Sequence, residues 1–160
     1  MANLQARGTT PDAWQQAIAA FHETSSACVL SVTGGGASAI ARLLEVPGAS
    51  HTILEAIVPY APAALDSWLA RPPEQYCSRE TALAMSAAAY ARAERLSGKP
   101  ADSARSIESG AEPQRRLLGI GCTASLVSSR PKRGDHRVHL AVHSSDATAW
   151  VSVTLAKGAR

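Results

Sequence analysis

Residues 30–50 read LSVTGGGASAIARLLEVPGAS, and this stretch sets the fold expected for the chain. An apolar run at 28–32 meets three consecutive glycines at 34–36, and a helix rich in small residues follows. A strand, a glycine turn and a helix N-terminus form a local geometry that binds anions, because glycine lets a ligand approach free backbone N–H groups. The stretch therefore predicts either a site for a phosphorylated or carboxylated small molecule or a tight turn without a ligand.

The composition predicts one globular domain over residues 1–160, with a flexible N-terminus at 1–10 and a mobile connection at 99–114. Aromatic residues make up only 4% of the chain, so its core is expected to consist of Leu, Val, Ile and Ala. No apolar run approaches the ~20 residues that span a bilayer, and the first residues lack the apolar segment of a secretory signal. A cytoplasmic protein without a membrane partner is expected.

The net charge of +3 is mildly basic and does not by itself indicate nucleic acid. A nucleic-acid-binding protein usually carries a denser basic stripe interleaved with aromatic side chains. No nucleic-acid partner is therefore expected.

The spacing of apolar residues predicts alternating helices and strands whose last strands run antiparallel. Thr10 is expected to cap the first helix and Ser78 the longest one, and the third strand is expected to be buried on both faces. Helices are expected at 11–24, 38–46, 63–70 and 79–96, and strands at 27–33, 52–58, 117–124, 136–143 and 148–155. This order favours an α/β fold, a three-layer α/β/α sandwich with a mixed sheet.

The densest basic cluster of the chain follows the third expected strand. Arginine can grip a phosphate through two hydrogen bonds and lysine adds a point charge, so the cluster is either a phosphate clamp over the glycine turn or an ordinary solvated loop. Its histidine, His136, could act as a general base near neutral pH or be an ordinary surface histidine. The cluster consists of Arg130, Lys132, Arg133, His136 and Arg137.

The cysteines and histidines do not have the spacing of a metal site. Cys28, Cys77 and Cys122 are expected to be reduced thiols. His139 and His143 share one face of an expected strand, but no carboxylate or cysteine at suitable spacing joins them. No metal and no other cofactor are expected.

Four segments of the chain, taken together and in order, resemble the C-terminal domain of the CinA (competence-damage-inducible) family, which includes nicotinamide mononucleotide deamidases. The segments are TGGGASAIARLLEVPGAS (33–50), Tyr60, CSRETALAMSAAAYARA (77–93) and GIGCTASL (119–126). The resemblance covers roughly residues 28–145 and implies an α/β/α sandwich that forms a homodimer or a larger homo-oligomer. It further implies hydrolysis of nicotinamide mononucleotide to nicotinate mononucleotide and ammonia, without a metal or an organic cofactor.

The functional residues of the family carry over unevenly. Its first motif reads Ala-Glu-Ser-Cys-Thr-Gly-Gly, with the serine as nucleophile, and a gapless count back from residues 47–50 places Thr33 on that serine and Val32 on the glutamate. Tyr60 falls on a tyrosine of the family site, but Leu65 stands where the family has a lysine. The resemblance therefore implies that Thr33 and Tyr60 are catalytic.

Two functions stay open, because amide hydrolysis by a hydroxyl needs a base and oxyanion donors and the family lysine is absent. The first is a CinA-like amidohydrolase acting on a pyridine mononucleotide. The second is a catalytically silent nucleotide- or phosphate-binding or assembly module of the same fold. In either case, the residues expected to contact ligand, beside the basic cluster, are Gly34, Gly35, Gly36, Ser38, Ser50, Thr123 and Ser125.

Overall fold

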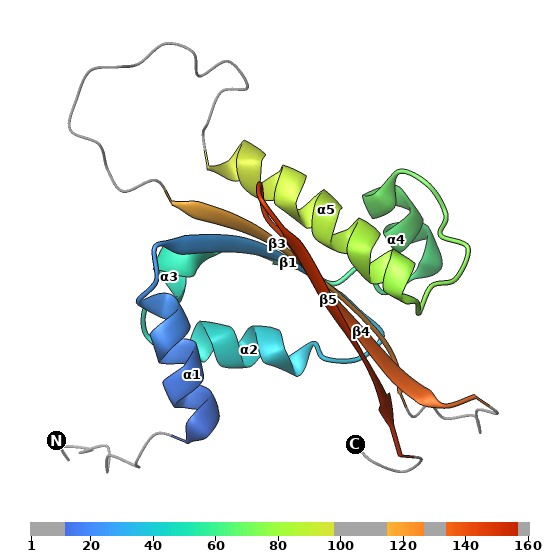
Figure 1. Ribbon diagram of the computed structural model, residues 1–160, viewed down its shortest axis with the longest axis horizontal. Helices are drawn as coiled ribbons and strands as arrows, with labels where there is room; N and C mark the ends of the chain where they lie inside the picture. The colour runs from blue at the N-terminus through green and yellow to red at the C-terminus, as the bar shows by residue number, and fades with distance from the viewer. Residues whose placement is uncertain (1–11, 98–114, 127–133, 157–160) are drawn as a thin grey trace, which may run out of the picture.

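The computed structural model describes residues 12–97, 115–126 and 134–156, which form a five-stranded sheet with helices on both faces (Figure 1). The strands are β1 (Ser26–Thr33), β2 (Ile53–Ile57), β3 (Arg116–Ser125), β4 (His136–His143) and β5 (Thr148–Leu155). The helices are α1 (Ala13–His22), α2 (Ser38–Glu45), α3 (Ala49–Thr52), α4 (Pro62–Leu69) and α5 (Arg79–Leu96).

The sheet is mixed, with the order β2-β1-β3-β4-β5. β1 pairs in parallel with β2 and β3, whereas β3, β4 and β5 pair antiparallel. Figure 1 shows α4 and α5 on one face of the sheet and α1, α2 and α3 on the other. The predicted α/β/α sandwich with a mixed sheet is therefore confirmed. Within the described residues, no helix has the length and apolarity needed to cross a bilayer.

Two glycines of β3 allow α5 to lie directly against the sheet. A Cβ atom added to Gly119 would come within 2.0 Å of the Ser86 carbonyl oxygen, and one added to Gly121 within 2.3 Å of the Ala82 carbonyl oxygen. Alanines of α5 and β1 complete this contact and are fully buried. The backbones of helix and strand thus meet where any larger side chain would hold them apart.

On the opposite face, a buried histidine ties the helices to one another. Nδ1 of His22, at the end of α1, lies 2.5 Å from Oγ1 of Thr52 in α3, and its Nε2 lies 2.9 Å from the carbonyl oxygen of Leu43 in α2. Helix α2 itself buries no residue, and Leu44 is exposed. These hydrogen bonds therefore hold a helical layer that packs less tightly than α5.

Three expectations about the elements were wrong. The cap of α1 is Asp12, whose carboxylate accepts from the Gln15 N–H, instead of Thr10, which lies outside the described residues. Residues 49–52 form the short helix α3, whereas no helix was expected between 46 and 52 and the next strand was expected to begin at 52. β3 is fully buried only toward α5, and side chains on its other face, such as Ile120, are half-buried, because α2 does not cover them.

An ion pair between β2 and α5 gives the fold a pH-dependent contribution. Nε of Arg92 donates to Oε2 of Glu55 at 2.8 Å and Nη2 donates to Oε1 at 3.1 Å. The hydrogen bond and positive charge of Arg92 lower the pKa of Glu55. A carboxylate with a lowered folded-state pKa stabilises the fold above its unfolded pKa, and this contribution is lost as pH falls through the folded value.

Arg92→Met is therefore expected to lower the free energy of unfolding at pH 7, and its difference from the wild type is expected to shrink as pH falls below the ordinary glutamate pKa of about 4.3 toward the lowered folded-state value. Urea denaturation at several pH values measures this difference. Arg71→Met is the matched control, since Arg71 has no ion pair among the described residues. A difference that stays constant down to pH 3 would contradict the assignment.

Candidate functional site

The predicted site residues of three segments meet in a hollow of about 310 Å³ where the parallel strands β1 and β3 end, called here the β1–β3 hollow. Thr33 at the end of β1 is the register partner of Thr123 on β3. Ligands of α/β proteins bind beyond the carboxyl ends of such strands. The lining residues are Thr33, Gly34, Tyr60, Ala61, Pro62, Leu65, Tyr76, Cys77, Thr123, Ala124 and Ser125.

The glycine turn lies very close to β3. Gly34 has φ +78°, and a Cβ atom added to it would come within 1.8 Å of the Ala124 carbonyl oxygen. Only glycine adopts this backbone conformation in so little space. The turn after β1 therefore forms one wall of the β1–β3 hollow, and β3 forms the next.

The segment before α5 closes the hollow from the α4–α5 side. The Thr123 hydroxyl donates to the Tyr76 carbonyl oxygen at 2.8 Å, and the Thr81 hydroxyl donates to the Gln75 carbonyl oxygen at 2.6 Å. The Tyr76 hydroxyl donates to Asp66 of α4 at 3.0 Å, and this hydrogen bond raises the pKa of Tyr76. These contacts hold Tyr76 and its neighbour Cys77 at the hollow.

The side chains that line the β1–β3 hollow favour binding over proton transfer. Thr33 is 8% exposed, and its hydroxyl donates to the Pro59 carbonyl oxygen at 3.0 Å. Tyr60 is 71% exposed and stands at the mouth. Sγ of Cys77 lies 3.8 Å from the Arg137 carbonyl oxygen. The lining holds no lysine, histidine or carboxylate among the described residues, so its titratable groups are phenols and a thiol.

Several expected ligand residues lie elsewhere. Gly36 and Ser38 line a separate hollow between α1 and α2. Gly35 contributes to neither hollow, and a Cβ atom on it would meet the Leu126 side chain at 2.4 Å. Ser50 is exposed on α3 and lines neither hollow. The single anion cradle expected from residues 34–38 is thus divided between two places.

The expected phosphate clamp is described only in part. Arg130, Lys132 and Arg133 lie outside the described residues. The guanidinium of Arg137 is exposed, lies 3.4 Å from the Asp135 carboxylate and does not line the β1–β3 hollow. His136 is buried, and its Nδ1 has no hydrogen-bond partner within the described part of the chain.

Sequence reasoning missed three residues at or beneath the hollow. Tyr76 and Cys77 line it; Cys77 begins the segment 77–93 that carries the resemblance, but neither residue was expected to contact ligand. Ser31 lies two residues before Thr33 on the same face of β1; it is fully buried and, among the described residues, its hydroxyl has no hydrogen-bond partner. The available signals for Ser31 were the alternation of strand side chains and the match of residues 31–35 to Ser-Cys-Thr-Gly-Gly.

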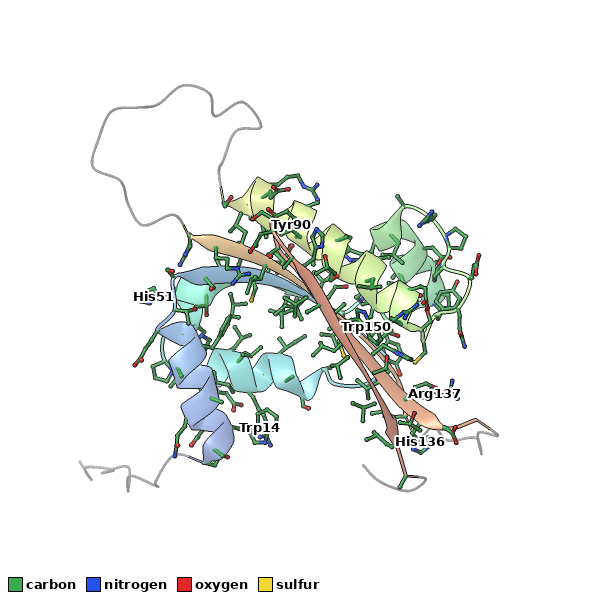
Figure 2. All side chains as sticks on the ribbon, in the orientation of Figure 1. Trp14, His51, Tyr90, His136, Arg137 and Trp150 are labelled. Atoms are coloured by element: carbon green, nitrogen blue, oxygen red, sulfur yellow. The ribbon has the colours of Figure 1, made fainter. Side chains whose placement is uncertain are left out.

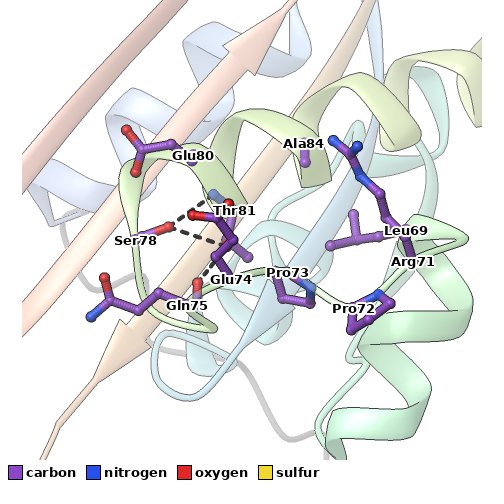
Figure 3. Close-up of a pocket in the computed structure, with 10 residues that line it drawn as sticks. All are labelled: Leu69, Arg71, Pro72, Pro73, Glu74, Gln75, Ser78, Glu80, Thr81 and Ala84. Atoms are coloured by element: carbon purple, nitrogen blue, oxygen red, sulfur yellow. Dashed lines mark hydrogen bonds between the residues drawn. The ribbon is translucent and has the colours of Figure 1, made fainter.

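A further hollow of about 490 Å³ lies between the end of α4 and the start of α5 (Figure 3). Ser78 accepts there from the Thr81 N–H as the expected cap of α5. Arg71, Glu74 and Glu80 contribute its charged groups. None of the site residues expected from the sequence lines it.

Two of the thiols are largely buried, and two of the imidazoles form hydrogen bonds between β4 and β5. Burial raises the pKa of Cys28 to about 12 and also raises that of Cys122. Nδ1 of His139 lies 2.6 Å from the Ser152 hydroxyl, and Nδ1 of His143 lies 2.6 Å from the hydroxyl of Thr148. Within the described ranges, no three His, Cys, Asp or Glu side chains are placed to hold a metal ion.

No protein-family model matches the chain, and no curated protein matches it significantly. Solved structures do match. The competence/damage inducible protein CihA from Agrobacterium tumefaciens has a TM-score of 0.58 at 16% identity, over 92% of this chain and 83% of that one. The competence-damaged protein (CinA) superfamily protein from Escherichia coli has a TM-score of 0.59 at 12% identity, over 93% and 82%.

The corresponding superfamily protein from Enterobacter cloacae has a TM-score of 0.59 at 13% identity, over 98% of this chain and 85% of that one. These matches span nearly the whole chain and include both helical layers. At such low identity they establish architecture and not activity. The chain has the fold of the CinA superfamily proteins.

Proposed function

We propose that the β1–β3 hollow binds a pyridine mononucleotide and that the protein hydrolyses the amide of nicotinamide mononucleotide. One observation carries this proposal. Site residues from three separate segments line one hollow. They are Thr33 and Gly34 where β1 ends, Tyr60 after β2, and Thr123 and Ser125 at the end of β3. The resemblance to the CinA family implied Thr33 and Tyr60 as site residues, the strand-end position suggested Thr123 and Ser125, and the shared fold supports taking them together.

Each lining group has a role in this proposal. The backbone at Gly34 and the hydroxyls of Thr123 and Ser125 provide polar contacts for the phosphate or the amide. The exposed ring of Tyr60 stacks on the pyridine at the mouth. A volume of about 310 Å³ is at the small end of the range for ligand sites, so part of the nucleotide extends outside.

A second function, binding without turnover, is favoured by the chemistry of the lining. The Thr33 proton is donated to the Pro59 carbonyl oxygen, and the described lining has no histidine, lysine or carboxylate to accept it. An unactivated hydroxyl is a weak nucleophile. In this case the chain keeps the ligand site and has lost the amidase reaction.

Two measurements on the full chain separate these functions. Nicotinamide mononucleotide, nicotinate mononucleotide and inorganic phosphate are tested for their effect on the melting temperature, and ammonia release is then followed enzymatically. A higher melting temperature with both mononucleotides and release of ammonia from the first support the amidase. Stabilisation without ammonia identifies the binding module, and no response to either mononucleotide rejects both.

Tyr60→Ala is expected to weaken nicotinamide mononucleotide binding about tenfold, since stacking of a base on an aromatic ring contributes roughly 1–3 kcal/mol. The melting temperature without ligand is expected to stay unchanged, because the side chain is mostly exposed. Isothermal titration calorimetry measures the affinity, with Tyr60→Phe as the variant that retains binding. An equal loss of affinity for ribose 5-phosphate, which has no ring to stack, would contradict this role.

The homodimer implied by the resemblance and the cytoplasmic location stay predictions. Apolar side chains are exposed on both faces of β5, whose outer edge is unpaired among the described strands and offers a place for a second copy. Trp150, Val151 and Val153 are each about half exposed there.

A further inference from the structure

A second candidate binding site lies on the face of the sheet opposite α4 and α5. It is a hollow of about 500 Å³ between α1 and α2, called here the α1–α2 hollow. Trp14 and Ile18 of α1 line it together with Arg42 and Leu43 of α2. Figure 2 shows the Trp14 side chain projecting from α1 on the side of α2. It shares no lining residue with the β1–β3 hollow, although Gly36 belongs to the same glycine turn.

The walls of the α1–α2 hollow are apolar and accessible. Trp14 is 67% exposed, although tryptophan carries one of the largest apolar surfaces of any side chain. Ile18 closes the floor and is 9% exposed, while Leu43 is half-buried. Clefts of this volume with predominantly apolar walls are typical of small-molecule sites. An aromatic group inserted beside Trp14 would bury surface that the fold leaves in water.

The rim of the hollow carries a positive charge that no carboxylate of the described residues neutralises. Arg42 is exposed and forms no ion pair among the described residues, and the lining contains no carboxylate. Ser38 lines the hollow one helical turn before Arg42, so its hydroxyl is on the same side of α2. A guanidinium beside a hydroxyl suits a planar carboxylate, which accepts two parallel hydrogen bonds from arginine.

We propose that the α1–α2 hollow binds a small aromatic carboxylate, with its ring against Trp14 and its carboxylate on Arg42. The apolar wall favours binding of the ring, and the Arg42 guanidinium favours a negatively charged ligand over a neutral one. This site is distinct from the pyridine mononucleotide site proposed above, because the two hollows share no lining residue.

The test compares two probes of one shape, naphthalene-2-carboxylate and the neutral naphthalene-2-carboxamide, by titration calorimetry of the full chain. The carboxylate is expected to bind about tenfold more tightly, as a charge-assisted hydrogen bond allows. Arg42→Gln is expected to abolish this preference, and Trp14→Ala to weaken both probes. Arg71→Gln, which removes an exposed arginine outside this hollow, is expected to leave both affinities unchanged.

Three results would overturn the proposal. The first is equal affinity of the wild type for both probes, or no binding of either at millimolar concentration. The second is displacement of the carboxylate probe by nicotinamide mononucleotide, which would place the probe in the β1–β3 hollow. The third is a dimer in light scattering that Trp14→Ala dissociates, which would make the hollow an interface between copies.

Discussion

Gly119→Ala is expected to destabilise the protein by about 3 kcal/mol or more, because overpacking against backbone cannot be relieved by a side-chain movement. The added methyl would lie 2.0 Å from the Ser86 carbonyl oxygen and 2.2 Å from the Tyr90 nitrogen, so α5 must leave the sheet to accommodate it. Urea denaturation followed by circular dichroism measures the loss. Gly134→Ala is the matched control, since nothing lies within 4 Å of its added Cβ atom.

Urea denaturation of Gly121→Ala tests whether the backbone of α5 approaches β3 as closely at this second glycine. Its added methyl would meet the Ala82 carbonyl oxygen at 2.3 Å and the Ser86 nitrogen at 2.6 Å. A comparable loss of stability is therefore expected. If either β3 variant unfolds at the same urea concentration as Gly134→Ala, the contact between β3 and α5 is looser than described.

Thr33→Ala is expected to reduce ammonia release from nicotinamide mononucleotide by at least about a hundredfold while the chain stays folded. The hydroxyl of Thr33 is the one that both lines the β1–β3 hollow and stands, in the gapless alignment, on the family nucleophile. Thr33→Ser keeps the hydroxyl and removes a methyl that restricts its rotation, so it is expected to retain activity. Initial rates of ammonia release measure both variants.

Ser31 and Cys77, which carry nucleophilic groups near Thr33, are the controls for this prediction. Residues 31–35 read Ser-Val-Thr-Gly-Gly and also match the family's Ser-Cys-Thr-Gly-Gly, an alignment that places Ser31 on the nucleophile. The structure buries Ser31 completely, whereas Cys77 lines the hollow. Ser31→Ala and Cys77→Ala are both expected to retain ammonia release. Loss of release in one of them, with Thr33→Ala still active, would transfer the role to that residue.

Much of the fold was predictable because its signals are local. The bounds of α5, β4 and β5 were found where they were expected, since Ser78 caps the helix and the strands alternate regularly. The cap of α1 was also readable, because Asp12 and Gln15 have capping-box spacing, but Thr10 before Pro11 was preferred. The half-buried face of β3 was not readable, since it depends on how loosely α2 packs.

In the candidate site too, residues fixed by local sequence were predictable and residues placed by long-range contacts were not. Thr33 and Gly34 could be placed at the end of a strand because one continuous stretch of sequence determines them. Tyr76 and Cys77 could not, because their position depends on the hydrogen bond from Thr123 to the Tyr76 carbonyl oxygen, which joins distant parts of the chain. The division of the glycine turn between two hollows likewise depends on where α1 lies.

The parallel pairing of β1 with β3 also determines when the β1–β3 hollow can exist. β1 emerges early during synthesis on the ribosome, but its neighbour β3 belongs to the last third of the chain. Closing so long a loop is slow, and the apolar β1 lacks this partner until it closes. A truncated chain that stops before residue 116 therefore carries the glycine turn but not the second wall of the hollow.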